Sequence, residues 1–372
     1  MKNKDIFTFR DAEKQAGPVA FSTMLKPAGS ACNLDCHYCY YLDKAVQYGG
    51  RQAVMSDELL ELYVRQYIEA NEVPTVQFCW HGGEPLLLGV DFYRKAMDFQ
   101  QKYADGKKIE NILQTNGTLV DEAWCDLFAG NNFLVGISLD GPQDIHDAFR
   151  LTKGGRPTFE RVMRTIEMFQ RSGVEYNTLS VVNRLCEGRG GEIYRFFRDT
   201  VHSRYMQFLP AVEHVVDKPG FHRPLIVSPD REGARLAEWS VTAKGYGGFL
   251  CDVWVVSDVG RTFVQMFDAT LAQWCGVPPG VCSMGETCGD ALVVEHNGDV
   301  YSCDHFVYPE YKLGNIRETP LSEIYRSRKR VDFGLAKRNA LSAECLRCKY
   351  YFACRGECPK HRFETGSDGC RK

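Results

Sequence analysis

Apolar and polar positions in the first part of the chain repeat with two different periods. Runs of apolar, β-branched and aromatic residues predict six strands, at 21–26, 75–80, 109–115, 133–139, 174–182 and 204–209. Between them, apolar residues recur three and four positions apart, which predicts amphipathic helices. The chain to about residue 210 is therefore expected to alternate strand with helix.

Two of the helical segments have recognisable ends. Residues 56–70 begin with Ser56 as the predicted N-cap, followed by two acidic residues in the first turn. In residues 157–173, Thr158 is expected to cap the helix and Gly173 to end it. The apolar face of this second helix consists of Phe159, Val162, Met163, Ile166 and Phe169.

Strands that alternate with helices favour an α/β fold with a parallel sheet, here a partial (β/α)6 barrel of the TIM type. In such folds the reactive side chains gather at the C-terminal ends of the strands. ACNLDCHYCYYLD (31–43) follows the first strand, HGGEP (81–85) follows the second and QTNGT (114–118) ends the third. The sequence thus predicts a site at this end of the barrel.

The rest of the chain is less regular. The segment SPDREGARLAEW (228–239) has a Ser-Pro start and suggests a helix, and ALVVEHNGDVYSC (291–303) predicts a hairpin with Asn297-Gly298 at its turn. The C-terminal part is dense in cysteine and poor in long apolar patterns, so it is expected to rely on metal for its fold. The expected domains are the barrel, a connecting helical region and a cysteine-rich domain, at 1–235, 236–280 and 281–372.

Composition narrows the functional classes. The chain has 372 residues, 44% of them hydrophobic, and a net charge of −3, so no basic field indicates nucleic acid. No apolar run approaches the ~20 residues of a membrane span. The N-terminal residues lack the apolar core of a secretory signal, so we expect a cytoplasmic protein, and a monomer.

The chain has sixteen cysteines, and in the reducing cytoplasm these are not expected to form disulfides. Clustered cysteines in such proteins more often bind metal or take part in catalysis. Three of them lie within eight residues: Cys32, Cys36 and Cys39. Eight crowd the last quarter of the chain: Cys282, Cys288, Cys303, Cys345, Cys348, Cys354, Cys358 and Cys370. The other five are scattered and are expected to be small core hydrophobes.

The first group has the spacing C-x3-C-x2-C, with no fourth cysteine until Cys79. Three thiolates on a four-iron cluster leave one iron free to bind another molecule. The spacing resembles that of the radical S-adenosylmethionine (SAM) superfamily. That resemblance implies that the free iron is chelated by the amine and carboxylate of SAM, and that one electron from the cluster cleaves the sulfonium to a 5'-deoxyadenosyl radical. A zinc site or chance clustering is the alternative.

The segment at 81–85 strengthens the resemblance, because the superfamily keeps a GGEP-type loop against the SAM amino group. Glycine there lets backbone approach a ligand closely. The resemblance implies SAM contacts, which in this sequence fall on Tyr41, Gly82, Gly83, Glu84, Ser138, Asp140 and Arg150. His81 stands where close relatives carry glutamine, so its role stays open. The alternative for each polar residue is a satisfied turn residue or a surface charge.

The C-terminal cysteines resemble the SPASM domain, which binds two auxiliary four-iron clusters in peptide-modifying radical enzymes. The resemblance implies that Cys282, Cys288, Cys303 and Cys358 hold the nearer cluster, and that the outer cluster is held by Cys345, Cys348, Cys354 and Cys370. Two four-cysteine zinc sites are the alternative. Relatives place the last ligand somewhat later. Cys370 is therefore either the eighth ligand or a cysteine ahead of a ligand that the chain lacks.

Several segments resemble the anaerobic sulfatase-maturating enzymes, among them LKPAGSACNLDCHYCYY, HGGEPLLLG, FLVGISLDGPQDIHDAFR and VVEHNGDVYSCDHF. The resemblance implies oxidation of a cysteine or serine in an unfolded sulfatase segment, C/S-x-P-x-R, to Cα-formylglycine. It also implies a ferredoxin or flavodoxin as electron donor and Asp304, after Cys303, as the base. An aspartate that accepts turn N–H bonds is the alternative for that residue.

Two rival functions remain. One is another SPASM peptide maturase that forms a thioether or carbon–carbon crosslink, and the other is a zinc-dependent interaction module on a barrel scaffold. Three clusters would give about twelve irons per chain, whereas the zinc module would contain none.

Overall fold

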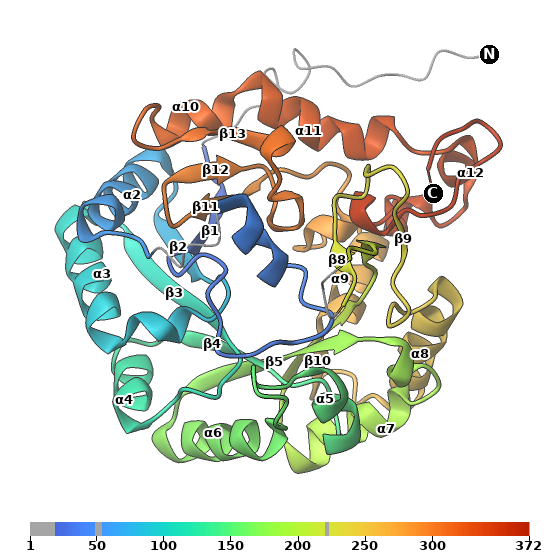
Figure 1. Cartoon of the computed structure of the whole chain (residues 1–372), viewed down its shortest axis with the longest axis horizontal. Helices are drawn as coiled ribbons and strands as arrows, with labels where there is room; N and C mark the ends of the chain where they lie inside the picture. The colour runs from blue at the N-terminus through green and yellow to red at the C-terminus, as the bar shows by residue number, and fades with distance from the viewer. Residues whose placement is uncertain (1–18, 49–53, 220–222, 372) are drawn as a thin grey trace.

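The computed structural model describes residues 19–48, 54–219 and 223–371. All six predicted strands are present as parallel neighbours, in the order of the sequence, within a ten-stranded sheet. They are β1 (Ser22–Lys26), β2 (Thr75–Trp80), β3 (Lys108–Thr115), β4 (Leu134–Ser138), β5 (Glu175–Val182) and β6 (Tyr205–Pro210). The sheet curves into a ring in Figure 1, and its two edge strands are not paired with each other. The expected α/β fold with a partial barrel is therefore confirmed.

The sheet extends beyond the six strands at both ends. The predicted hairpin is present as β11 (Ala291–Glu295) and β12 (Asp299–Tyr301), and β11 pairs in parallel with β1. β13 (Lys312–Asn315) continues the sheet on that side, and β10 (Phe263–Val264) pairs with β6 on the other. The hairpin of the C-terminal region thus belongs to the same sheet as the barrel. The domain boundaries stay a prediction.

Helices surround the sheet in Figure 1. Those that connect consecutive strands include α2 (Asp57–Ala70), α3 (Val90–Tyr103), α4 (Glu122–Gly130), α5 (Gln143–Phe149), α6 (Phe159–Ser172) and α7 (Gly190–Arg195). Ser56 caps α2 as predicted, because its side chain accepts a hydrogen bond from the backbone N–H of Leu59. Gly173 ends α6 in the left-handed conformation, also as predicted.

The predicted N-cap of α6 is at the expected residue, but that residue does not make the expected capping hydrogen bond. Thr158 occupies the N-cap position, but its hydroxyl donates to the carbonyl oxygen of Arg150 at 2.6 Å and makes no cap bond. Asp147 caps the helix instead, since its carboxylate accepts the backbone N–H groups of Thr158 and Phe159. The tertiary position of α5 brings this carboxylate to α6.

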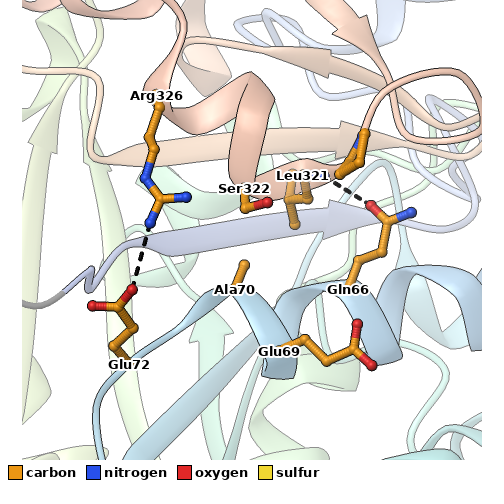
Figure 2. Close-up of a pocket in the computed structure, with 8 residues that line it drawn as sticks. Gln66, Glu69, Ala70, Glu72, Leu321, Ser322 and Arg326 are labelled. Carbon is orange, nitrogen blue, oxygen red and sulfur yellow. Dashed lines mark hydrogen bonds and ion pairs between the residues drawn. The ribbon is translucent and has the colours of Figure 1, made fainter.

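The C-terminal region also packs on the outside of the barrel. Figure 2 shows α10 (Leu321–Arg326) lying over α2, where the backbone N–H of Leu321 donates to the side-chain oxygen of Gln66 at 2.8 Å. Arg326 pairs with Glu72 at 3.4 Å at the end of the same contact. The C-terminal region thus holds the first helix of the barrel.

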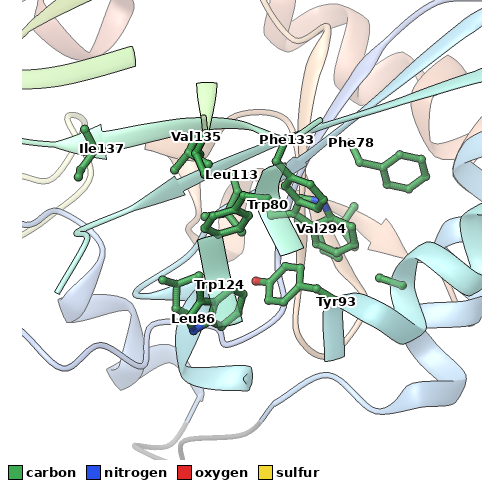
Figure 3. Close-up of a cluster of buried hydrophobic side chains, with 14 of the residues drawn as sticks. Phe78, Trp80, Leu86, Tyr93, Leu113, Trp124, Phe133, Val135, Ile137 and Val294 are labelled. Carbon is green, nitrogen blue, oxygen red and sulfur yellow. The ribbon is translucent and has the colours of Figure 1, made fainter. Parts of the chain in front are cut away.

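The main hydrophobic core lies between the sheet and its helices. Along β2, the buried residues Val76, Phe78 and Trp80 alternate with the more exposed Gln77 and Cys79. Figure 3 shows the aromatic part of this core, in which Trp80 and Tyr93 of α3 meet edge to face. Since the apolar face of the strand is turned to the helices, the inner face of the barrel is left for polar groups.

The connecting region differs from its prediction. Residues 228–239 form turns and the short strand β9 (Arg235–Leu236) rather than a helix, because that segment pairs with β7 (His214–Val216). β8 (Leu225–Ile226) completes a small three-stranded sheet. The expected helices of the region follow as α8 (Ala243–Val256) and α9 (Gln265–Trp274).

The remaining C-terminal elements are short apart from α11 (Arg328–Asn339), and they include α12 (Ala343–Arg347) and α13 (Tyr351–Cys354). Within the described residues, no helix combines the length and the apolar composition that a membrane span requires.

Candidate functional site

The three-cysteine loop follows β1 and lies inside the ring of strands in Figure 1. Cys32, Cys36 and Cys39 lie near enough for their charges to act on one another. Burial raises the pKa of all three thiols, that of Cys32 to about 12. The protein alone therefore disfavours three thiolates here, and a bound cation would stabilise them. Three sulfur donors on one short loop fit an iron–sulfur cluster.

The backbone of this loop is held by the end of α5 and the residues just after it. The N–H of Asp35 donates to the carbonyl of Leu151 at 2.8 Å, and that of His37 donates to the carbonyl of Phe149 at 3.1 Å. Leu34, between the first two cysteines, is 1% exposed and packs with Phe149. The loop is thus held by its own backbone and apolar residues, so its cysteines are free to bind metal.

The HGGEP segment lies directly against the cysteine loop. The N–H of Gly83 donates to the carbonyl of Gly29, and the N–H of Glu84 donates to that of Ala31, both at 2.8 Å. A Cβ on Gly83 would lie 2.0 Å from the carbonyl oxygen of Ala31. Only glycine fits this approach. The two sequence motifs are therefore one structural unit.

Glu84 is fully buried, and both of its carboxylate oxygens accept hydrogen bonds from the protein. One oxygen accepts from the N–H of Leu86 and the hydroxyl of Thr115, and the other from the N–H of Asn116, at 2.8 to 3.0 Å. Burial raises the pKa of Glu84 to about 7. These bonds join the second loop to the third, and the predicted SAM contact of Glu84 stays a prediction.

Asn116 is a contact residue that sequence reasoning missed. Its side-chain amide lies 3.8 Å from Sγ of Cys32 and donates to Asn33 at 2.9 Å. It stands in QTNGT, the segment already noted at the end of the third strand. All three predicted loops therefore meet at the first cysteine.

Asp140 and Arg150 form a buried pair. Arg150 donates to both carboxylate oxygens of Asp140, at 3.0 and 3.1 Å, and the hydroxyl of Tyr38 and the N–H of Val181 donate to the same carboxylate. Ser138 accepts a hydrogen bond from Gln114 at 3.0 Å. The pair supports the cysteine loop through Tyr38, and the SAM contacts of Ser138, Asp140 and Arg150 stay predictions.

Asp304 lies inside the barrel, beside the end of β1. It opens a short 3-10 turn, η6 (Asp304–Phe306), just after Cys303. Lys26 pairs with Oδ1 of its carboxylate, and the hydroxyl of Tyr40 donates to Oδ2. Burial raises the pKa of Asp304, but the neighbouring positive charges, that of Lys26 foremost, together outweigh burial and hold that pKa below its ordinary value. The carboxylate form of Asp304 is therefore favoured.

Lys26 and Tyr40 were not singled out in the sequence. The sequence signal for Lys26 was a charged residue at the end of an apolar, strand-like run. The structure shows that this lysine is fully buried. Tyr41, which was singled out, donates instead to the carboxylate of Glu295 at the end of β11. Its ring lies under the ammonium of Lys26, at 3.4 Å.

His81 is the remaining predicted residue of this centre. Its Nδ1 accepts a hydrogen bond from the N–H of Gly82 at 2.8 Å. Burial lowers the pKa of His81 to about 4, so the ring is neutral near pH 7. The ring lies close enough to Asp304 for a proton on it to affect that carboxylate, so the two residues lie in the same part of the barrel. Its role, and that of Gly82, toward SAM stays a prediction.

The thiols predicted for the nearer auxiliary cluster lie close together. After burial, the charges of Cys358, Cys288 and Cys282 raise the pKa of Cys303. Lys337 is anchored beside them, and its ammonium donates to the carbonyl of Cys282 at 2.7 Å. This proximity supports the predicted set of four, and its donor chemistry fits a cluster.

The predicted outer set is arranged around α12 and α13, which carry Cys345 and Cys354. Cys370 lies in a loop closed by a bridge between Thr365 and Arg371. Asp368 of this loop accepts the N–H of Ala343, the first residue of α12, at 2.5 Å. The loop of Cys370 therefore sits at the start of the helix that carries Cys345, and its role as a ligand stays a prediction.

A surface pocket of about 210 Å³ lies away from these loops, between α2 and α10 (Figure 2). Its lining includes Gln66, Glu69, Glu72, Ser322 and Arg326. None of the predicted site residues lines it, so it is not part of the candidate site.

Two family models match the chain. Residues 27–186 match the Radical SAM superfamily, and residues 282–349 match SPASM, an iron-sulfur cluster-binding domain. The first match contains the three-cysteine loop and the HGGEP segment. The second contains Cys303 and Asp304.

Curated proteins of similar sequence extend over most of the chain. The serine-type anaerobic sulfatase-maturating enzyme of Bacteroides thetaiotaomicron is 48% identical over 350 residues, which are 93% of this chain and 84% of that relative. The cysteine-type anaerobic sulfatase-maturating enzyme of Clostridium novyi is 35% identical over 354 residues, 92% of this chain and 89% of that relative.

Solved structures agree with these matches. The structure of native anSMEcpe with bound AdoMet and Cp18Cys peptide has a TM-score of 0.80 at 30% identity, over 94% of this chain and 91% of that one. Streptococcus suis SuiB has a TM-score of 0.56 at 14% identity, over 91% of this chain and 72% of that one, which shows a common fold alone.

Proposed function

The chain belongs to the anaerobic sulfatase-maturating enzymes, within the radical SAM superfamily, and from this we propose that it oxidises a cysteine or serine of a sulfatase to Cα-formylglycine. One observation carries the proposal. Asp304, which follows a predicted auxiliary-cluster cysteine, contacts Tyr40, which follows the last cysteine of the first loop. A base between the two metal sites is the arrangement that this reaction needs.

The chain would hold three [4Fe–4S] clusters and SAM. The first loop supplies three thiols, and the two C-terminal sets supply four each. When bound, the first cluster and SAM would supply a 5'-deoxyadenosyl radical able to take a hydrogen from the substrate Cβ. The proposed SAM-binding residues remain Tyr41, His81, Gly82, Gly83, Glu84, Ser138, Asp140 and Arg150.

Asp304 acts as the base in this proposal. Its carboxylate takes the proton from Sγ of a substrate cysteine or Oγ of a substrate serine, and the nearer auxiliary cluster, when bound, would accept the second electron. A serine would thereby become the aldehyde directly, whereas a cysteine would become a thioaldehyde that water hydrolyses to the aldehyde with release of hydrogen sulfide. Three features support this role: its contacts with Lys26 and Tyr40, the depressed pKa that keeps it ionised, and the adjacent Cys303.

We also propose the setting of the reaction. The substrate is an unfolded sulfatase segment of the form C/S-x-P-x-R, electrons come from a ferredoxin or flavodoxin, and the enzyme works in the cytoplasm as a monomer. Serine is the proposed preferred residue, because the relative of higher identity is a serine-type enzyme. The near-neutral charge of the chain suits recognition of a peptide backbone.

The test is a peptide assay with anaerobically purified and reduced enzyme. Two peptides that differ only in cysteine or serine at the C/S-x-P-x-R position are incubated with SAM, and mass spectrometry follows formylglycine. We expect the aldehyde with both and faster conversion of serine. SAM cleavage with a crosslinked peptide and no aldehyde would support the other SPASM maturases instead. Zinc without iron in the purified protein would reject radical chemistry altogether.

A further inference from the structure

Lys26 is a buried charge that the fold of β1 does not require. Its side chain is fully buried at the end of the strand, and its ammonium pairs with the Asp304 carboxylate. The rings of Tyr41 and Tyr40 lie 3.4 Å and 5.7 Å from the ammonium. A buried ammonium costs several kcal/mol unless it is paired, and an apolar side chain would fill the same place without that cost. A functional reason for the lysine is therefore to be sought at its partner.

Tyr40 is the second residue that holds Asp304. It follows Cys39 directly, and its hydroxyl donates to Oδ2 of the carboxylate. The ammonium of Lys26 pairs with the other oxygen, Oδ1. Each oxygen of Asp304 is therefore engaged by a different side chain. Two separate contacts fix both the position and the rotation of a carboxylate, whereas one contact leaves it free to turn.

A neighbouring ring and a neighbouring ammonium pack against Tyr40. The ring of His305 meets it edge to face at 5.1 Å, and the ammonium of Lys360 lies 5.2 Å from its centroid. Lys360 itself pairs with Glu213 at 2.6 Å, and both side chains are buried. The packing of His305 and Lys360 against its ring therefore orients the hydroxyl of Tyr40 toward Asp304.

We propose that Lys26 and Tyr40 are positioning residues for the proposed base. Through them the carboxylate of Asp304 keeps a fixed place relative to the cysteine loop, near which the substrate radical forms. The carboxylate takes the proton of the substrate thiol or hydroxyl, while the ammonium and the phenol keep theirs. The inference rests on the proposed function of Asp304.

The inference predicts uncoupling rather than loss of radical formation. In Lys26→Met or Tyr40→Phe the reductive cleavage of SAM continues, but the misplaced carboxylate meets the substrate proton less often. We expect the ratio of formylglycine formed to SAM cleaved to fall about tenfold or more, as for the loss of one hydrogen bond to a charged group. Lys26→Arg keeps the pairing charge and should recover part of the ratio.

The controls are Lys44→Met and Tyr48→Phe. Lys44 is another buried lysine, 2% exposed, whose ammonium lies 3.0 Å from the ring centroid of Tyr308, and the hydroxyl of Tyr48 bonds to Tyr301 at 3.2 Å. Lys44→Met removes a buried ammonium and Tyr48→Phe removes a half-buried hydroxyl, and neither change touches the carboxylate of Asp304. Iron content and SAM cleavage are measured for each variant, so that a folding defect is recognised by lost iron.

A double-mutant cycle decides between positioning and a separate role. If Lys26 works through Asp304, adding Lys26→Met to Asp304→Asn changes the residual ratio by less than twofold. A further tenfold loss in the double variant, or an unchanged ratio in both single variants with full iron, would overturn the inference. If Asp304→Asn itself keeps the ratio, the proposed function of that residue fails instead, and the two failures are thereby distinguished.

Discussion

Gly83 of the loop after β2 lies directly against Ala31 of the cysteine loop. A Cβ on Gly83 would lie 2.0 Å from the carbonyl oxygen of Ala31, a distance that real side chains do not tolerate. Backbone must shift if this glycine is replaced. Because Ala31 precedes Cys32, such a shift moves the first thiol of the proposed SAM cluster.

Gly83→Ala is therefore expected to disrupt the first cluster while leaving the others. The expected result is loss of about four of about twelve irons, together with loss of SAM cleavage. Iron and acid-labile sulfide are measured after anaerobic purification. Gly130→Ala is the control, since nothing lies within 4 Å of a Cβ at that helical position. Full iron in Gly83→Ala would contradict the structural role given to this contact.

Replacing the proposed base should separate radical formation from product. Asp304→Asn keeps the size of the side chain but removes the negative charge that pairs with Lys26. We expect SAM cleavage to continue and formylglycine formation to fall by about 10²- to 10⁴-fold, the usual contribution of a positioned base. Mass spectrometry of peptide and nucleoside products measures both. Wild-type product rates would remove Asp304 from this role.

The three-cysteine loop can be tested by itself. Cys36→Ala removes a buried thiol of the first group and should abolish SAM cleavage, with about eight irons retained in the C-terminal sites. The control is Cys125→Ala, which changes another buried cysteine, in α4 and outside the cysteine-rich segments. This variant should keep all of the about twelve irons. Retained SAM cleavage in Cys36→Ala would contradict the assignment of the loop.

The iron content of a variant can test whether Cys370 is a cluster ligand. Cys370→Ala should weaken only the outer cluster, because its loop is tied to the start of α12 through Asp368. We expect at most about four irons lost, with unchanged SAM cleavage. A variant with the same iron and the same spectrum as wild type would show that another group completes that cluster.

His146 should make stability depend on pH. Its ring is buried, with Nε2 at 3.0 Å from the hydroxyl of Thr158, and burial lowers its pKa from 6.5 to about 4. Since the folded state binds the proton less well, this contribution is complete above pH 6.5 and is lost as pH falls toward 4. From pH 7 to pH 5 it amounts to about 2 kcal/mol.

The measurement is the free energy of unfolding in denaturant at both pH values. His146→Gln should be less stable at pH 7, but its stability should fall less between pH 7 and pH 5 than that of wild type. His202→Gln changes an exposed histidine and serves as the control. Equal slopes for His146→Gln and wild type would refute the role of this ring.

Much of the site was present in the sequence because its chemistry is local. The spacing of Cys32, Cys36 and Cys39 is set within one loop, and the glycines of HGGEP mark a close backbone approach. Six periodic segments predicted the parallel strands that bring those loops to one end of the barrel. The helix suggested at 228–239 failed because pairing with β7 outweighed a local Ser-Pro signal.

The sequence by itself determined which residues can bind iron and how the first six strands follow one another. Only the tertiary structure decided that β11 pairs with β1, and that Asp304 lies against Lys26 and Tyr40. The reason is physical. Thiol spacing and strand periodicity are properties of neighbouring residues, whereas strand pairing and the partner of a buried charge depend on which distant segments fold against each other.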